Sequence, residues 1–383
     1  MTATAAIEIL DKLVSFDTTS RNANLPIIDY IESYLNDHDV ECFRVPDERE
    51  GWASLHATIG PQGVPGIGLS GHTDVVPVDG QDWDTDPFTL TEKDGKLYGR
   101  GACDMKGFLA CVMAAVPDLK KRKLKVPMHI LFSYDEEVGC TGVRPMIAEF
   151  GDRFVKPRMV IVGEPTNMSV VEAHKGGLRW NVTVTGRPVH SSMAPLGVNS
   201  INIAAELLNE LVDIENELKT AKVDERFSPP HSTLQVTQIR GGAASNIVPA
   251  ETWFGWEIRA LPGVDPEPYG ARFKRKAAEL VERMRQVAPE ADIKIEVANQ
   301  IPAFSADPAS EVLSLALKLV EQNETFAVSY GTEASLFHLA DAPSVVCGPG
   351  DIAQAHTPNE WIEKAELEKC MTFLGKLGDW AEA

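Results

Sequence analysis

Cysteine is sparse in this sequence and forms none of the patterns that bind metal through sulfur. The 383 residues include 6 cysteines, and no two of them are spaced as CxxC. Neither a disulfide framework nor a thiolate zinc finger is therefore expected. We expect the cysteines to be reduced and mostly buried. Cys103 and Cys140 lie beside acidic motifs and could line a site, but a small buried apolar side chain is the simpler interpretation of each.

Long apolar runs and an excess of basic charge are also missing. No stretch reaches the ~18 apolar residues that span a bilayer, and residues 1–12 lack the basic segment and apolar run of a secretory signal. Lys plus Arg number 36 against 56 Asp plus Glu, a formal net charge of −20. Such a surface repels nucleic acid. We expect a cytoplasmic protein that binds neither nucleic acid nor membranes.

The remaining composition is that of a folded globular chain. Hydrophobic residues make up 44% of the sequence and charged residues 24%. At about 150 residues per domain, the length predicts two domains. Helical and strand-like patterns alternate in the first part of the chain, which predicts an α/β domain with a sheet covered on both faces. The expected helices are 7–14, 27–35 and 108–119, and the expected strands are 54–59, 66–70, 128–134 and 159–163.

The pattern changes from about residue 178. A βαββαβ order follows, which predicts a compact ferredoxin-like α+β unit inserted into the first domain. Its expected strands are 180–185, 233–240, 252–259 and 293–297, and its helices are 201–218 and 269–287. A helix over 311–322, a strand over 344–347 and a closing helix over 362–380 return to the earlier pattern. We therefore predict a discontinuous domain formed by 1–177 and 299–383, and an insertion over 178–298.

Acidic and histidine side chains follow the ends of the predicted strands, where open α/β sheets bind ligands. They are His72, Asp74, Asp104, Glu136, Glu137 and Glu164, with His356 later in the chain. Imidazoles and carboxylates are suitable ligands for Zn²⁺, and two histidines with three carboxylates fit a pair of metals that share one bridge. A carboxylate that binds no metal can then accept the proton of the attacking water.

The spacing also suggests separate tasks within this group. Because neighbouring residues that leave a strand point different ways, one of Glu136 and Glu137 can bind metal while the other faces the water. Asp74 is placed to accept a hydrogen bond from the His72 nitrogen that faces away from the metal. Each residue taken singly is more often a capping or surface residue. Their occurrence at successive strand ends favours a two-metal hydrolase site.

Two other active-site motifs are incomplete in this sequence, and a third is missing. His72 stands where the Ser70 segment would need a glycine to form a nucleophile elbow. Asp104 stands where Gly99-Arg100-Gly101 would need the last glycine of a dinucleotide fingerprint. No HExxH pattern is present.

Four ordered motifs carry a resemblance to a known family. They are Ser70-Gly71-His72-Thr73-Asp74-Val75-Val76-Pro77, Gly99-Arg100-Gly101-Ala102-Cys103-Asp104-Met105-Lys106-Gly107, Asp135-Glu136-Glu137-Val138-Gly139 and Gly163-Glu164-Pro165. Together they resemble the M20 family of dinuclear zinc amidohydrolases and peptidases, and the match covers nearly the whole chain.

The resemblance implies a role for each residue of the cluster. His72, Asp104 and Glu164 would hold one zinc, and Asp104, Glu137 and His356 the other, with Asp104 as the bridge. Glu136 would be the general base. Co²⁺ or Mn²⁺ could substitute for Zn²⁺, because selectivity among these ions depends on geometry and supply.

The resemblance also assigns a role to the insertion. Residues 178–298 would be a lid and dimerisation domain, so that the protein would be a homodimer. His190, in Gly186-Arg187-Pro188-Val189-His190-Ser191-Ser192, would reach the active site of the partner and stabilise the oxyanion. From the sequence alone, His190 is a loop histidine after a strand.

Within the family, three stretches most resemble the branch that deacetylates N2-acetyl-L-ornithine in arginine biosynthesis: 13–22, 329–334 and 346–356. Thr332-Glu333 stands where the related succinyl-diaminopimelate desuccinylases usually carry Ser-Asp. Desuccinylase, aminoacylase or dipeptidase activity is the nearer alternative. A metal-dependent binding or regulatory protein without turnover is the more distant one, although every expected catalytic position is filled.

The same resemblance implies the substrate contacts. Asn246 and Arg259 match positions that hold the substrate carboxylate, a task that suits the planar guanidinium fork. Glu333 is a candidate for the substrate ammonium. A structural ion pair is the alternative for Arg259, and an ordinary acidic turn residue is the alternative for Glu333.

Overall fold

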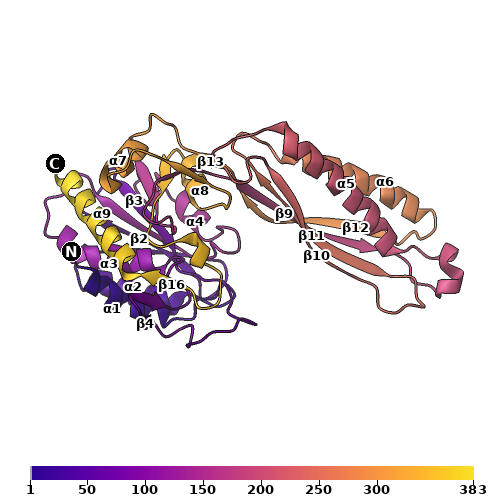
Figure 1. Ribbon diagram of the computed structural model, residues 1–383, viewed down its shortest axis with the longest axis horizontal. Helices are drawn as coiled ribbons and strands as arrows, with labels where there is room; N and C mark the ends of the chain where they lie inside the picture. The colour runs from indigo at the N-terminus through magenta and orange to yellow at the C-terminus, as the bar shows by residue number, and fades with distance from the viewer. Residues whose placement is uncertain (1) are drawn as a thin grey trace. The chain divides into compact units, whose positions relative to one another are not determined.

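The computed structural model describes residues 2–383 and divides the chain into two compact units. Unit 1 contains the residues up to Ala173, together with Phe304–Phe326 and Thr332–Ala383. Unit 2 contains His174–Ala303 and Ala327–Gly331. Figure 1 shows how the elements of each unit follow one another along the chain.

The boundaries of unit 2 differ from the predicted insertion over 178–298. The antiparallel pairing of the first and last strands of this unit continues to Gly177 and Ile301, which carries both boundaries outward. The short segment Ala327–Gly331 also belongs to unit 2, although the sequence assigns it to the discontinuous domain.

A large mixed sheet forms the centre of unit 1, as the sequence predicts. Its strand order is β1-β2-β6-β3-β7-β15-β8-β13, and β14 pairs with β8. The strands β6, β3, β7 and β15 run parallel to one another, whereas the pairs β1–β2, β2–β6 and β15–β8 are antiparallel. The bounds are β1 Cys42–Pro46, β2 Ala53–Ile59, β3 Ile67–His72, β6 Met128–Ser133, β7 Met159–Val162, β8 Val171–His174, β13 Phe304–Ser305, β14 Phe326–Val328 and β15 Ser344–Val346.

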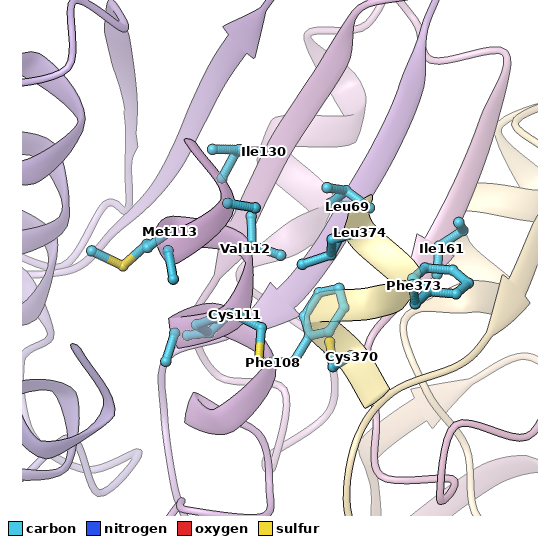
Figure 2. Packing of buried hydrophobic residues seen from close by; sticks show 14 of the residues in the cluster. Leu69, Phe108, Cys111, Val112, Met113, Ile130, Ile161, Cys370, Phe373 and Leu374 are labelled. Carbon is cyan, nitrogen blue, oxygen red and sulfur yellow. The ribbon is translucent and has the colours of Figure 1, made fainter. Parts of the chain in front are cut away.

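Helices cover both faces of this sheet. One face carries α1 Ala3–Val14, α2 Leu25–Asn36, α3 Lys106–Leu119, α7 Glu311–Val320 and α9 Lys364–Glu382, and the other carries α4 Val143–Ala148 and α8 Ala334–Leu339. Figure 2 shows Phe108 and Val112 of α3 in one apolar cluster with Leu69 of β3 and Leu374 of α9. This apolar layer fixes α3, and therefore the loop that precedes it, against the sheet.

A second, three-stranded sheet in unit 1 has the order β16-β5-β4, with β4 at Thr91–Lys93, β5 at Lys96–Tyr98 and β16 at Trp361–Glu363. The sequence predicts a closing helix from residue 362, but 361–363 pair with β5 and the helix begins at Lys364. This pairing brings Glu360 beside Gly99, whose N–H donates to the Glu360 carbonyl at 3.0 Å.

Unit 2 is a four-stranded antiparallel sheet with two helices on one face. The sheet order is β10-β11-β9-β12, which with the chain order is the ferredoxin-like arrangement predicted from the sequence. Trp180 and Trp256 stack at 4.0 Å between ring centroids in its core. The bounds are β9 Gly176–Thr185, the 3₁₀ helix η1 Ser191–Leu196, α5 Ser200–Ala221, β10 Thr233–Gly241, β11 Glu251–Ala260, α6 Glu267–Arg285 and β12 Asp292–Ile301.

The structure bears on the cysteines and on the apolar character of the helices. The cysteines are free thiols, and all are buried except the partly exposed Cys42. Within residues 2–383, no helix combines the length and the apolar character needed to cross a membrane.

Candidate metal centre

The predicted ligands meet at one edge of the unit 1 sheet. β3 ends at His72, β6 is followed by Glu136 and Glu137, β7 is followed by Glu164, and β15 leads into the loop that carries His356. Because β6, β3, β7 and β15 are parallel, their carboxyl ends lie at the same edge. Asp104 comes from the loop before α3.

The first part of the centre, which we call the buried half, contains His72, Asp104 and Glu164. His72 Nε2 lies 3.1 Å from Asp104 Oδ1 and 3.6 Å from Glu164 Oε1. The His72 side chain is only 1% exposed. Glu164 Oε1 is buried without a hydrogen-bond partner among the described residues. A buried oxygen in this state is costly, and a bound cation would satisfy it.

The second part, which we call the loop half, contains Asp104, Glu137 and His356. His356 Nε2 lies 3.0 Å from Glu137 Oε2 and 3.3 Å from Asp104 Oδ2. Asp104 thus turns one carboxylate oxygen toward each histidine, which is the arrangement of a bridging ligand. The His356 side chain is 53% exposed, in contrast to His72.

The donor atoms fit a pair of divalent ions. Ligand atoms of His72, Asp104 and Glu137 lie within 4.8 Å of one another, as do those of His72, Glu136 and Glu164. Imidazole nitrogen and carboxylate oxygen suit Zn²⁺ and similar ions. Glu136 therefore lies within the same cluster as the expected ligands.

Burial and mutual repulsion shift the titration of these carboxyl groups. Burial raises the pKa of Glu136 and of Glu164 well above their usual range, and raises the pKa of Glu137 to about 7. Burial acts in the same direction on Asp104, but the contacts with His356 and His72 outweigh it and hold the Asp104 pKa below its usual range. The packed acidic groups favour a cationic occupant.

The acidic groups raise the pKa of both histidines. Hydrogen bonds to Asp104 and Glu137 raise the pKa of His356 to about 10. Burial acts to lower the pKa of His72, but the charges of Glu164, Asp104 and Asp74 raise it well above its usual value. The protein without metal therefore holds protons where a cation would lie.

Asp74 contacts the far nitrogen of His72 chiefly through its main-chain oxygen. His72 Nδ1 lies 2.9 Å from the main-chain carbonyl oxygen of Asp74 and 3.5 Å from its carboxylate. The carboxylate is occupied elsewhere: it accepts from Ser20 Oγ at 2.7 Å and from the main-chain N–H groups of Glu136 and Glu137 at 3.1 and 3.3 Å. Asp74 thus orients the His72 ring through its main chain and the 136–137 turn through its side chain.

Glu333 is buried beside the ends of β3 and β6. Its exposed fraction is 1%, and its carboxylate accepts from Ser70 Oγ at 3.1 Å and from Ser133 Oγ. Among the described residues these hydroxyls are its side-chain hydrogen-bond partners, and no cation pairs with it. Burial raises its pKa to about 7. The contact with a substrate ammonium stays a prediction.

The three other predicted residues belong to unit 2. His190 is exposed at the start of η1, with Nδ1 2.8 Å from Ser192 Oγ. Asn246 is exposed and accepts at its main-chain oxygen from Ser191 N–H at 2.9 Å. Arg259 donates from Nε and Nη2 to Glu257, each at 3.2 Å. The alternative considered for Arg259, a structural ion pair, is therefore present in the structure.

Two cysteines and one glutamate complete the surroundings. Cys140 Sγ lies 3.4 Å from Glu136 Oε1, and Cys103 Sγ lies 3.3 Å from the Asp351 carbonyl. Both are buried, as expected of small apolar residues. The sequence interpretation missed Glu360, which accepts from the N–H groups of Cys103 and Asp104 at 2.9 and 3.0 Å. Its place four residues after His356 gives no local signal of that role.

Comparison with known proteins identifies the family. The model of peptidase family M20/M25/M40 matches residues 68–378, which include all the candidate ligands. The chain belongs to this family. M20 relatives named acetylornithine deacetylase include one from Myxococcus xanthus, 35% identical over 96% of this chain and 95% of its own, and one from Proteus mirabilis (strain HI4320), 35% identical over 94% and 91%.

A solved M20 structure has the same fold. The metallo-carboxypeptidase Sso-CP2 from Sulfolobus solfataricus matches with a TM-score of 0.78 and 19% identity, over 98% of this chain and 99% of its own. Family membership, the named relatives and the ligand cluster make this M20 protein a metal-dependent hydrolase that acts on an amide bond.

Proposed function

We propose that the protein hydrolyses N2-acetyl-L-ornithine to L-ornithine and acetate, a step of arginine biosynthesis. The observation that carries this proposal is the 35% identity, over nearly the whole chain, to relatives named acetylornithine deacetylase. The Asp104 carboxylate shared between His72 and His356 supports two metal ions as the catalytic device.

The residues that would hold the metals are those of the two halves. His72, Asp104 and Glu164 would hold one Zn²⁺, and Asp104, Glu137 and His356 the other. Bound there, a zinc pair would lower the pKa of a water molecule and polarise the amide carbonyl. The unpartnered Glu164 Oε1 and the raised carboxyl pKa values support a doubly cationic occupant.

Glu136 is the proposed general base. The Asp74 carboxylate holds its main-chain N–H at 3.1 Å, so the turn that carries Glu136 is fixed. Burial raises its pKa well above the usual range, which brings a carboxylate closer to the proton affinity that a base needs near neutral pH. Glu136 would take a proton from the attacking water and deliver it to the leaving amine nitrogen.

Residues of both units would recognise the substrate. Arg259 and Asn246 would hold its carboxylate, which requires Arg259 to exchange or share its contact with Glu257. Glu333 would face the distal ammonium, because its buried carboxylate has two hydroxyl donors and no cationic partner. Unit 2 would act as lid and dimerisation domain, and His190 would stabilise the oxyanion in the site of the partner of a homodimer.

The test is acetate release by the zinc-loaded protein from N2-acetyl-L-ornithine, measured beside succinate release from N-succinyl-L,L-diaminopimelate. We expect turnover of the acetyl compound, reduced roughly 10²- to 10⁴-fold by Glu136→Gln with zinc content unchanged. The matched control is Glu279→Gln, whose side chain is 72% exposed on α6. Preference for the succinyl compound would contradict the substrate assignment and leave the metal centre standing. Loss of zinc in Glu136→Gln would make this residue a ligand.

A further inference from the structure

A chain of polar side chains connects the two loops that carry Asp104 and His356. It begins at Glu360, which is 1% exposed. One carboxylate oxygen accepts from the N–H groups of Cys103 and Asp104, and the other accepts from Gly101 N–H at 3.1 Å. The Glu360 carboxylate therefore fixes the main chain of the loop that presents the shared ligand.

Arg100 continues the chain toward residue 81. Its Nη1 donates to Glu360 at 2.7 Å and its Nη2 donates to Gln81 Oε1 at 2.6 Å. Arg100 is 1% exposed, and its guanidinium lies 5.1 Å from the ring centroid of Trp83. A buried guanidinium fork held at two points cannot reorient without breaking an ion pair.

Gln81 ends the chain at the loop half. Its Oε1 accepts from both Arg100 and Trp83 Nε1, the latter at 3.1 Å. These two donors decide which end of the amide is oxygen, so Nε2 must face the other way. There it donates to the main-chain carbonyl of His356 at 3.1 Å.

The His356 peptide depends on such a contact. His356 has a φ of 62°, the left-handed region that residues other than glycine rarely adopt. Its side chain is half exposed, and its contacts, to Asp104 and Glu137, are all at the Nε2 atom, far from the main chain. Nearby, the Asp84 N–H donates to Asn359 Oδ1 at 2.8 Å, a second bond between the same two loops. Strained main-chain geometry persists only where neighbouring contacts hold it.

We propose that Gln81 is a positioning residue for the loop half of the metal centre. Through its amide it fixes the His356 peptide relative to Asp104, and so sets the zinc affinity of the Asp104–Glu137–His356 position. His72 and Glu164 of the buried half do not depend on Gln81, because they lie at the ends of β3 and β7. The loop of Asp104 is held by the Glu360 carboxylate, which Gln81 does not contact directly. The inference rests on the proposed two-metal function, whose second ion would lie here.

Gln81→Glu separates the two contacts of this side chain. Glutamate keeps an oxygen that Arg100 and Trp83 can donate to, and replaces the donor that faces the His356 carbonyl by a second oxygen. We expect the affinity of one zinc equivalent to fall 10- to 100-fold, the usual effect of losing a residue that orients a ligand. The other equivalent should keep its affinity. Gln81→Met, which removes both the donor and the Oε1 acceptor without adding charge, should weaken the same equivalent.

The measurement is zinc stoichiometry by competition with a chelator, together with thermal unfolding of the metal-free variants. Gln286→Glu adds the same charge on unit 2, and it should change neither the zinc affinities nor the thermal unfolding by as much as the Gln81 variants do. In a His356→Ala background, which lacks the loop-half ligand, Gln81→Glu should not alter the affinity of the remaining equivalent. That background shows which of the two positions Gln81 controls.

Two results would overturn parts of this account separately. A wild type that binds two zinc ions, with Gln81→Glu and Gln81→Met binding both at wild-type affinity, overturns the role of Gln81 and leaves the proposed function intact. A wild type that binds only one zinc ion overturns the two-metal function, and the role of Gln81 with it.

Discussion

The two halves of the metal centre are built from similar side chains by different means. In the buried half, His72 is the last residue of the parallel strand β3 and Glu164 lies two residues after the parallel strand β7, and the His72 side chain is 1% exposed. In the loop half, His356 lies on an irregular loop with a left-handed main chain and is 53% exposed. The sheet ladder itself positions one half, whereas side-chain hydrogen bonds position the other. The two halves should therefore respond differently to substitution.

The difference has a physical origin in the supporting bonds. A strand end is held by the main-chain hydrogen bonds of its neighbours, which no single side chain controls. The His356 peptide accepts one hydrogen bond from Gln81, and that side chain depends in turn on Arg100 and Glu360. We expect the buried half to bind metal more tightly and the loop half to be the more easily emptied.

Asp104→Asn should have the largest effect, because this residue belongs to both halves. The amide offers one oxygen where the carboxylate turns one oxygen to each histidine. We expect both zinc equivalents to weaken and acetate release to fall to the detection limit. Zinc stoichiometry and acetate assays would measure this, with Asp118→Asn, 42% exposed, as control. Retention of one tightly bound zinc would show that Asp104 serves one half alone.

Replacing His72 by alanine should lower the free energy of unfolding more than replacing His356 does. In the metal-free protein, His72→Ala leaves Glu164 buried without its cationic neighbour and leaves Asp104 with His356 alone, which should cost about 3 kcal/mol of the free energy of unfolding. His356→Ala removes a half-exposed group and should cost no more than ~1 kcal/mol.

Denaturant unfolding in the presence of a chelator would measure both variants against the wild type. Zinc titration adds the complementary result: His356→Ala should still bind one equivalent. Equal losses of stability in the two variants would mean that burial does not distinguish the halves.

The buried half could be predicted from the sequence because its signals are local. The apolar runs that become β3 and β7 end in Gly or acidic residues, so the positions of His72 and Glu164 at strand ends follow directly. The ferredoxin-like order of unit 2 follows from its alternating pattern for the same reason. The outward extension of its terminal strands does not, because their paired ends carry no apolar signal.

The support of the loop half could not be predicted, because it joins residues far apart in the chain. Three strands, β4, β5 and β16, are each three residues long, which is too short for a periodic pattern. The last two residues of β16 are predicted to lie in the helix expected from 362. Their pairing places Glu360 against main-chain N–H groups near Asp104. Nearly every residue has such an N–H group, so the sequence gives no sign of which ones a carboxylate will contact. Two of the contacts of the Asp74 carboxylate escaped prediction for the same reason, since they are with the main-chain N–H groups of Glu136 and Glu137.

In the metal-free protein without substrate, Glu333→Gln should act on the pH dependence of stability, because the substrate contact proposed for Glu333 is then absent. The folded state raises the pKa of Glu333 from 4.5 to about 7, so the folded protein keeps a proton that the unfolded chain has lost. The contribution of this proton to the free energy of unfolding is fully present below pH 4.5 and is lost as the pH rises through 7. Between pH 5 and 7 this loss is ~2 kcal/mol, and the Glu333→Gln variant cannot show it because an amide does not ionise in this range.

Chemical unfolding at pH 5 and pH 7, with a chelator present, would measure the difference between wild type and variant. Glu333 accepts hydrogen bonds from Ser70 on β3 and Ser133 on β6, so it supports the strands behind the buried half. His356→Ala should therefore retain the part of the pH dependence that Glu333→Gln removes. If Glu333→Gln leaves the pH dependence unchanged, the carboxylate is ionised in the folded protein at pH 5, and a buried negative charge behind β3 and β6 would have to be balanced from within the metal centre.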